Sequence, residues 1–380
     1  MTGLVVAIVL LVAATVPILM LRDLRTLPAG ALPPSAPSVS VVIPARNEEA
    51  TLPDLLATLQ RQTIRPAEVV VVDDGSQDAT AAVAAAGGAR VLPAGTPPPG
   101  WTGKAWACHL GAQATSGELL LFLDADTALS PTALSSLLAA RETYGGLVSV
   151  QPFHRVERTY EQLSAYFNAV AVLASGAFTG GAPRGSIAFG PCLLTSRADY
   201  LAAGGHEAVR GEILDDAQLA AAYSRAGLPV WCAVGGGSIT MRSYPGGPRQ
   251  LVAGWTKNFA SGAAAADPLA ALGSVLWISA HHAIAVGAVL STVAATTGWG
   301  GSPTSGPALL WLAAWVVAAW QLRRLLSRVG SFRWWTWALF PLPLLVFDLV
   351  FARSAALTLV RRSVRWRGRE VDLRRSRSTS

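Results

Sequence analysis

Three pairs of aspartates stand where two carboxylates could act together: Asp73 with Asp74, Asp124 with Asp126, and Asp215 with Asp216. Carboxylate oxygens bind hard divalent cations, and a carboxylate can also take a proton from a reacting hydroxyl group. Aspartate is equally common in tight turns and in the first turn of helices. The predicted strands and helices around each pair must therefore show whether its role is catalysis or metal binding, or only the formation of a turn or helix start.

The segment Asp124-Ala125-Asp126 ends an apolar run at 117–126. In an extended segment, side chains at positions i and i+2 share one face. Two carboxylates just past a buried strand would be costly without a cation, which favours a metal site at Asp124 and Asp126. The alternative is that the segment, which precedes Ser130-Pro131, caps the next helix.

Apolar, β-branched runs at 39–45, 68–76 and 117–126 predict three strands, each followed by a helix-like stretch. Strands that alternate with helices predict a mostly parallel sheet, in which ligands gather at the carboxyl ends of the strands. Polar residues stand at all three of those ends, namely Arg46-Asn47-Glu48, Asp73-Asp74-Gly75 and Asp124-Ala125-Asp126. We therefore expect a single site there.

The two remaining pairs are open to both interpretations. Asp73 or Asp74 could accept a hydrogen bond from a base or ribose beside Gly75, or could simply form an Asp-Gly turn. Asp215 and Asp216 begin a helix-like pattern, where the helix N-terminus favours carboxylates. Asp216 could instead act as a catalytic base.

Composition indicates a membrane protein. Of the 380 residues, 52% are hydrophobic and only 14% are charged, against about 25% charged in an ordinary soluble domain. The net charge is +7, and arginine clusters flank apolar runs, so anionic lipid is a better partner than nucleic acid. Cys108, Cys192 and Cys232 lack metal-ligand spacing, which favours a reduced, cytosolic catalytic domain.

The apolar runs divide the chain. Residues 4–20, followed by Arg22 and Arg25, predict an uncleaved anchor whose carboxyl end lies in the cytoplasm. Residues 268–293 and 307–322 are long enough to span a bilayer. The predicted parts are an anchor (1–25), a Pro-rich linker (26–37), a catalytic domain (38–262), a membrane region (263–362) and a basic cytoplasmic tail (363–380).

The stretch 334–360 carries arginines at both flanks and prolines at 341 and 343. Because both flanks prefer the cytoplasm, we predict a kinked or re-entrant hairpin there rather than a straight span. Residues 158–178 predict either a helix at the membrane surface or a buried domain helix. The pair His281-His282 lies within a predicted span, where packing is favoured over a ligand role.

Taken in order, these segments resemble family 2 glycosyltransferases of the GT-A fold. The matching text is VVIPARNEEATL (41–52), VVVVDDGSQDAT (69–80), LLLFLDADT (119–127), GPCLLTSRADYLAAGGH (190–206) and ILDDAQLA (213–220). The resemblance implies a UDP-sugar donor and a divalent cation, Mg²⁺ or Mn²⁺. It implies these roles: Pro44, Ala45, Asn47 and Glu48 line the nucleotide pocket; Asp74, with Asp73 as a second candidate, holds the base; Asp124 and Asp126 meet the diphosphate and metal; Asp216, beside Asp215, is the catalytic base.

A finer resemblance lies in PPPGWTGKAWACHLGA (97–112) and in Trp366-Arg367-Gly368-Arg369. Both are similar to bacterial carotenoid and hopanoid glycosyltransferases of the diaponeurosporenoate glucosyltransferase type and, more distantly, the first is similar to ceramide glucosyltransferases. The resemblance implies that Lys104 approaches the donor phosphates; the alternative is a solvated loop lysine.

One departure concerns the Gln-x-x-Arg-Trp motif of processive family members. Only Trp255 fits this motif. It could stack on the acceptor or the sugar, or it could anchor the protein at the membrane interface. Arg249 and Lys257 flank it and could replace the missing arginine as a phosphate contact. The loss favours a single transfer over polysaccharide synthesis.

We therefore expect an inverting enzyme of the plasma membrane that moves one sugar, with UDP-glucose as the expected donor, to a carotenoid or hopanoid. Two alternatives are a glycolipid or polyprenyl-phosphate glycosyltransferase and an inactive sugar-nucleotide-binding membrane protein.

Overall fold

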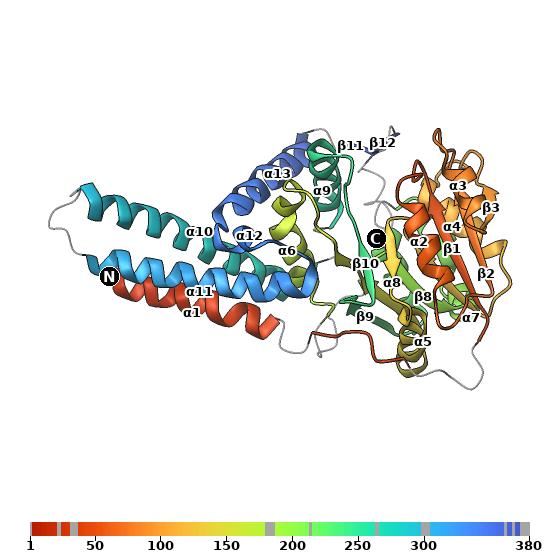
Figure 1. Cartoon of the computed structure of the whole chain (residues 1–380), viewed down its shortest axis with the longest axis horizontal. Coiled ribbons are helices and arrows are strands. Elements are labelled where there is room, and N and C mark those ends of the chain that lie inside the picture. Colours follow the sequence, from red (N-terminus) through yellow and green to blue (C-terminus); the bar gives the residue numbers. More distant parts are fainter. Residues whose placement is uncertain are drawn as a thin grey trace.

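A computed structural model describes residues 2–20, 24–30, 37–178, 187–212, 215–262, 266–297, 305–360, 363–366 and 369–372. It consists of an α/β domain and a helical arm, which lie on the right and the left of Figure 1. The arm comprises three long helices: α1 (Thr2–Met20), α10 (Pro268–Thr297) and α11 (Ser305–Val329). Four further helices lie between the arm and the domain: α6 (Ala165–Ser175), α9 (Pro248–Gly262), α12 (Trp334–Ala338) and α13 (Pro341–Val360).

The predicted α/β class is confirmed by a seven-stranded sheet of order β3-β2-β1-β4-β8-β6-β9. Its strands are β1 (Val39–Ala45), β2 (Glu68–Asp73), β3 (Arg90–Pro93), β4 (Leu119–Leu123), β6 (Leu147–Gln151), β8 (Cys192–Ser196) and β9 (Val230–Val234). Neighbours pair in parallel except β8, which runs antiparallel to both β4 and β6. The sheet is thus mostly parallel and holds β1, β2 and β4 side by side.

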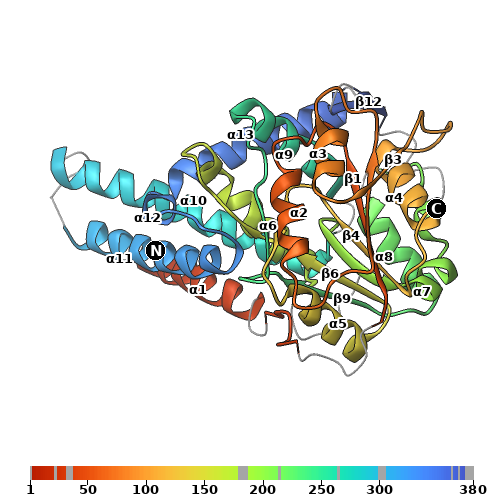
Figure 2. The same cartoon turned by 45° about the vertical axis from the view of Figure 1, so that its right-hand side comes forward.

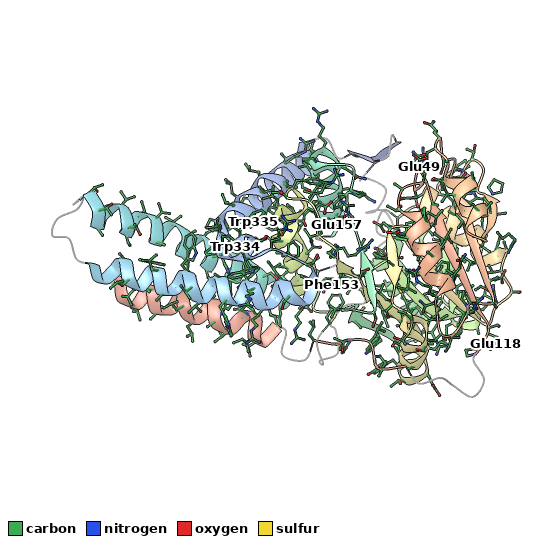
Figure 3. The ribbon with its side chains drawn as sticks, in the orientation of Figure 1. Glu49, Glu118, Phe153, Glu157, Trp334 and Trp335 are labelled. Carbon is green, nitrogen blue, oxygen red and sulfur yellow. The ribbon has the colours of Figure 1, made fainter. Side chains whose placement is uncertain are left out.

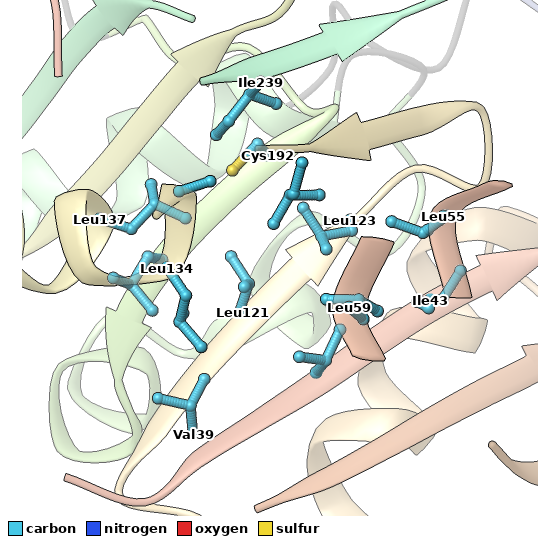
Figure 4. Close-up of a cluster of buried hydrophobic side chains, with 14 of the residues drawn as sticks. Val39, Ile43, Leu55, Leu59, Leu121, Leu123, Leu134, Leu137, Cys192 and Ile239 are labelled. Carbon is cyan, nitrogen blue, oxygen red and sulfur yellow. The ribbon is translucent and has the colours of Figure 1, made fainter. Parts of the chain in front are cut away.

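Alternate residues of the central strands enter two separate cores. Leu119, Leu121 and Leu123 of β4 pack with helices α2 (Leu52–Gln60) and α5 (Ala133–Tyr144), the cluster drawn in Figure 4. Leu120 and Phe122 face the opposite way, toward α4 (Gly103–Gln113) and α8 (Asp215–Arg225). Strands covered on both faces are apolar throughout, which explains the continuous run LLLFL in β4.

Smaller elements complete the domain. Helix α3 (Thr80–Ala86) joins β2 to β3, and β5 (Thr127–Leu129), β7 (Phe153–His154) and β10 (Ile239–Met241) form a second sheet of order β5-β10-β7. Short helices η1 (Glu161–Ser164), α7 (Arg197–Ala202) and η2 (Gly205–Val209) lie in the connections, and β11 (Ser363–Trp366) pairs with β12 (Arg369–Asp372). Arg367 and Gly368, which carry part of the lipid-enzyme resemblance, lie outside the described residues.

Two stretches of the arm, Pro268–Thr297 and Ala308–Val329, are helical, long and apolar enough to cross a membrane. Large apolar side chains point outward from all three arm helices, for example Leu11, Val289 and Val316. In water such a surface would be unfavourable, so it suits contact with a membrane or another apolar partner. Arg22 of the predicted anchor and most of the loop between α10 and α11 lie outside the described residues.

The stretch 334–360 forms two unequal helices, α12 and α13, with Pro341 as the first residue of α13. Just before α12, the amide of Arg333 donates a hydrogen bond to the side chain of Gln162. Helix α13 then packs against α9, where the hydroxyl of Ser354 donates to the carbonyl oxygen of Thr256. The prolines therefore stand at the start of the returning helix, where proline is tolerated, rather than in the middle of the stretch. Figure 3 marks Trp334 and Trp335 on the arm side of Phe153 and Glu157. Whether this stretch enters a bilayer stays a prediction.

Two further segments are bound to the body of the protein. The start of the predicted linker pairs with the sheet edge, because Thr26 bridges Val234. Helix α6, within the stretch 158–178, has buried residues along most of its length and packs against α10, α11 and α13. Figure 2, turned by 45°, shows it between the arm and the sheet. Of the two interpretations, the buried helix agrees with the structure.

Helix α4 carries Lys104, and its position depends on Gly111. A Cβ atom at Gly111 would lie 2.3 Å from Cγ1 of Val42 and 3.1 Å from Cγ2 of Val72, so α4 contacts β1 and β2 through its backbone. Gly111→Ala should lower the free energy of unfolding by about 1–3 kcal/mol, because the methyl group overpacks the core. Thermal unfolding would measure it, with Gln113→Ala on the exposed face of α4 as the control. Equal stability of the two variants would contradict this close packing.

Candidate active site

The carboxyl ends of β1, β2 and β4 open into one cavity of about 2160 Å³. Eleven of the twelve residues predicted from the sequence line it: Pro44, Ala45, Asn47, Glu48, Asp74, Lys104, Asp124, Asp126, Asp215, Asp216 and Trp255. Parallel strands bring their carboxyl ends to the same edge, which is why the residues after β1, β2 and β4 converge, and helices α4, α8 and α9 add Lys104, Asp215, Asp216 and Trp255. The expectation of a single site at this edge agrees with the geometry.

Asp73 is the residue that does not line the cavity. Its Oδ1 accepts a hydrogen bond from the Ser76 amide at 2.9 Å, and Gly75 has a φ of +70°. Asp73 thus forms the turn after β2. Asp74 is the member of the pair that faces the cavity, and its carboxylate lies 3.5 Å from Nη1 of Arg46.

The loop after β1 is held by the loop after β2. Asn47 adopts a φ of +55°, a conformation that asparagine tolerates better than most residues. Its Oδ1 accepts from the Gln77 amide at 2.8 Å, and the Glu48 amide donates to Oγ1 of Thr80 at 2.8 Å. These two residues therefore shape the pocket wall through structural bonds as well as by lining it.

Lys104 stands in the first turn of α4, whose N-cap Thr102 accepts from the Ala105 amide. Its Nζ lies 2.8 Å from Oδ1 of Asp124. Removal from water lowers the pKa of Lys104, but the charges of Asp124 and Asp215 more than compensate and raise it well above its usual value. A permanently charged ammonium at a helix N-terminus is a suitable contact for phosphate oxygens. The solvated-loop alternative is wrong, because Lys104 is on a helix and ion-paired.

The two carboxylates at the start of α8 differ in their surroundings. Asp216 accepts from the amides of Gly190, at 2.7 Å through Oδ2, and of Ala217, at 2.9 Å through Oδ1. A Cβ atom at Gly190 would lie 3.1 Å from both Asp216 Oδ2 and Lys104 Nζ, so this glycine allows the close approach. No signal in the sequence distinguished Gly190 from its neighbours, because its partners come from other segments.

Asp215 is buried, and its Oδ2 has no hydrogen-bond partner among the described residues, which exclude the preceding Ile213 and Leu214. Burial raises the pKa of Asp215 to about 6, and the nearby charge of Asp216 adds to this rise while Lys104 opposes it. A carboxyl group with such a raised pKa in a cavity is typical of a functional site.

Helix α9 contributes Trp255 and Lys257 to the cavity, whereas Arg249 is exposed and does not line it. Trp255 stacks on Phe167 with ring centroids 5.0 Å apart, and its indole Nε1 is buried without a partner among the described residues. Burial and the charge of Lys104 lower the pKa of Lys257. Of the two cations proposed to replace the missing arginine, only Lys257 lies at the cavity.

The donor atoms at the predicted metal position are carboxylate oxygens of Asp124 and Asp126, both on the cavity wall. No group of three or more His, Cys, Asp or Glu residues that could hold a metal ion occurs in the described part of the chain. A cation here would take its other ligands from a diphosphate and water, as Mg²⁺ and Mn²⁺ do at phosphate sites. The residues fit a cation that arrives with a nucleotide substrate.

The same cavity extends away from the sheet between three helices. Its far walls are mainly apolar and come from α6, α10 and α13, and they include Phe167, Val170, Ala171, Val275, Ile278, Phe347 and Phe351. Most of these residues lie in segments that the sequence associates with the membrane. The cavity thus joins a charged end at the sheet to an apolar end at the arm.

Comparison with known proteins gives relatives along most of the chain. Residues 40–176 match the family described as glycosyl transferase family 2. A 4,4'-diaponeurosporenoate glycosyltransferase of Staphylococcus haemolyticus (strain JCSC1435) is 40% identical over 248 residues, which are 63% of this chain and 66% of that protein. A protein of the same name from Staphylococcus aureus (strain MRSA252) is 33% identical over 342 residues, which are 88% of each chain.

Among solved structures, glucosyl-3-phosphoglycerate synthase from Mycobacterium tuberculosis, in complex with Mn²⁺, uridine diphosphate and glucosyl-3-phosphoglycerate, is similar with a TM-score of 0.43. It is 22% identical, and the match covers 64% of this chain and 88% of that one.

The raised pKa of Asp215 predicts a pH-dependent stability. The group titrates near 6 when folded and near its usual value of about 3.9 when unfolded, so the folded protein binds this proton more tightly. Its contribution to stability is therefore full below about pH 4 and is lost as the pH rises through 6. Asp215→Asn cannot ionise, and relative to the wild type it should gain about 1–3 kcal/mol between pH 4.5 and 7.5.

Thermal unfolding of the detergent-solubilised protein at the two pH values would measure this gain. The control is Glu118→Gln, an exposed carboxylate that Figure 3 labels at the far end of the domain. Identical pH dependence of wild type and Asp215→Asn would show that the assignment to Asp215 is wrong.

Proposed function

The chain belongs to glycosyltransferase family 2, and we propose that it moves one sugar from a nucleoside-diphosphate sugar to a lipid bound in the apolar end of the active-site cavity. The observation that carries this proposal is the continuity of the cavity, which connects the aspartates at the sheet edge to apolar walls of α6, α10 and α13. A soluble acceptor would not require such walls, whereas transfer of an apolar chain from water to these walls lowers its free energy.

We propose a carotenoid-type lipid as the acceptor, and UDP-glucose as the donor. The acceptor follows from the two staphylococcal relatives, whose names specify a carotenoid acid as the glycosylated compound. The enzyme would lie in the plasma membrane with α1, α10 and α11 as spans and its catalytic domain in the cytoplasm, because Arg25 and the arginines in the last turns of α11 flank the domain side.

Each end of the donor has complementary residues. The walls formed by Pro44, Ala45, Asn47 and Glu48 suit a planar base, and the Asp74 carboxylate can accept from its N–H groups. The amino end of α4 and the Lys104 ammonium neutralise the diphosphate as negative charge builds on the leaving group. A divalent cation held by Asp124 and Asp126 would supply further neutralisation of that charge.

At the acceptor end, Asp216 is the proposed base. Its carboxylate is oriented by the Gly190 and Ala217 amides, and an acceptor hydroxyl that approaches it would lose its proton as it attacks the anomeric carbon from the side opposite the diphosphate. Such an in-line attack inverts the configuration. Trp255 lines the cavity, its buried indole N–H has no partner among the described residues, and its ring is suited to pack against the sugar or the acceptor there.

Asp216→Asn should lower kcat by about 10²–10⁴-fold with a hydroxyl acceptor, because an amide cannot take the proton. Release of UDP and formation of glycosylated lipid, resolved by mass spectrometry, would measure the loss. The matched control is Gln218→Ala, two residues along α8 and exposed. Full activity of Asp216→Asn would reject the base assignment.

Asp126→Ala should raise the concentration of Mg²⁺ or Mn²⁺ needed for half-maximal activity by roughly tenfold or more, because one of two protein ligands is lost. Titration of UDP release with each cation gives the measurement. The Asp73→Ala variant serves as the comparison, since Asp73 lies outside the cavity wall. An unchanged cation requirement in Asp126→Ala would remove this residue from the metal site.

A further inference from the structure

A polar pair stands in the apolar end of the cavity. His282 on α10 and Asp348 on α13 approach each other at 2.7 Å between Nε2 and Oδ2, and both line the cavity beside Ile278, Phe347 and Phe351. Their side chains are 42% and 40% exposed. Ionisable groups in an apolar region are costly, so they commonly mark a functional position.

The hydrogen-bond pattern leaves one acceptor atom for a ligand. Nδ1 of His282 lies 2.9 Å from the carbonyl oxygen of Ile278, and a carbonyl can only accept, so Nδ1 carries a hydrogen. Nε2 shares a proton with Oδ2 of Asp348. Both ring nitrogens are thus engaged. Oδ1 of Asp348 has no hydrogen bond from any of the residues described, and it belongs to a side chain on the cavity wall.

The neighbouring His281 shows what a purely structural histidine looks like in this helix. It is fully buried, its Nδ1 is 3.0 Å from the carbonyl oxygen of Trp277, and its ring packs against Trp277 and Phe340. His282 and Asp348 are instead partly open to the cavity. A pair that served only to join α10 to α13 would be expected to be buried in the contact between the two helices. In such a buried contact, two apolar side chains would stabilise the protein at least as well as an ion pair.

We propose that Asp348, held in place by His282, accepts a hydrogen bond from a hydroxyl group of the lipid acceptor, at a point away from the group that receives the sugar. This inference rests on the proposed function, because it assumes a lipid in this cavity. The geometry assigns the acceptor class as a long apolar molecule with a hydroxyl group besides the group that receives the sugar. A chain that lacks this hydroxyl leaves the Asp348 oxygen unpaired in an apolar site, which weakens its binding.

The test compares two acceptors with the detergent-solubilised full-length enzyme and UDP-glucose: a linear polyene diol with a hydroxyl at each end, and the monohydroxy polyene of the same length. The diol has a twofold statistical advantage because either end can react. The wild type should prefer the diol in kcat/KM by about tenfold beyond that factor. Asp348→Leu should reduce the preference to the statistical factor, because the oxygen that pairs with the second hydroxyl of the diol is removed and no unpaired oxygen faces the monohydroxy chain.

Asp348→Asn keeps a carbonyl oxygen and should retain part of the preference, which also guards against a folding defect in the leucine variant. Arg353→Leu is the control, because it removes a charge from an exposed position of the same helix away from the cavity wall. An equal loss with both acceptors in both Asp348 variants would make the pair structural and overturn the inference. An undiminished diol preference in Asp348→Leu would do the same. Failure of the wild type to glycosylate either polyene, or a polyene acid of the same length, would instead overturn the proposed function, and this inference with it.

Discussion

The ion pair between Lys104 and Asp124 links the parts of this active site. It joins the first turn of α4 to the carboxyl end of β4, and Lys104 also lies within the field of Asp215 and Asp216 from α8. Four charged groups thus come from three elements that the sheet alone would not hold together. Without the ammonium, three carboxylates would face one another across a half-buried cavity, where unscreened like charges are strongly unfavourable.

The packing beneath the pair is correspondingly close. Gly111 lets α4 contact the valines of β1 and β2, and Gly190 lets the backbone reach Asp216 and Lys104 at once. Both glycines act by the absence of a side chain. The charged cluster is therefore positioned by backbone contacts, which cannot rearrange as flexible side chains do.

Helices outside the α/β domain supply what its sheet edge lacks. The sheet edge is polar and suits a nucleotide, but it offers no apolar surface for a lipid. Helices α6, α10 and α13 form that surface, and Trp255 stacked on Phe167 stands where the two halves of the cavity meet. The return of α13 toward α9 places Phe347, Asp348 and Phe351 on the cavity wall.

The sequence alone determined the class of fold and the strands that carry the site, because these follow from short-range patterns: the continuous apolar runs of buried strands and the polar residues after them. The resemblance to family 2 glycosyltransferases then singled out further residues of the cavity wall, among them Lys104 and Trp255. Only the tertiary structure distinguished the members of each pair. Asp73 and Asp74 are adjacent and chemically identical, yet one forms a turn and the other faces the cavity.

Likewise Asp215 and Asp216 differ only in burial and hydrogen bonding, and Lys257 rather than Arg249 reaches the site. His282 and Asp348, 66 residues apart, became a pair only when α10 and α13 packed together. Burial, charge pairing and the convergence of distant segments depend on three-dimensional contacts, and no local pattern of residue types encodes them.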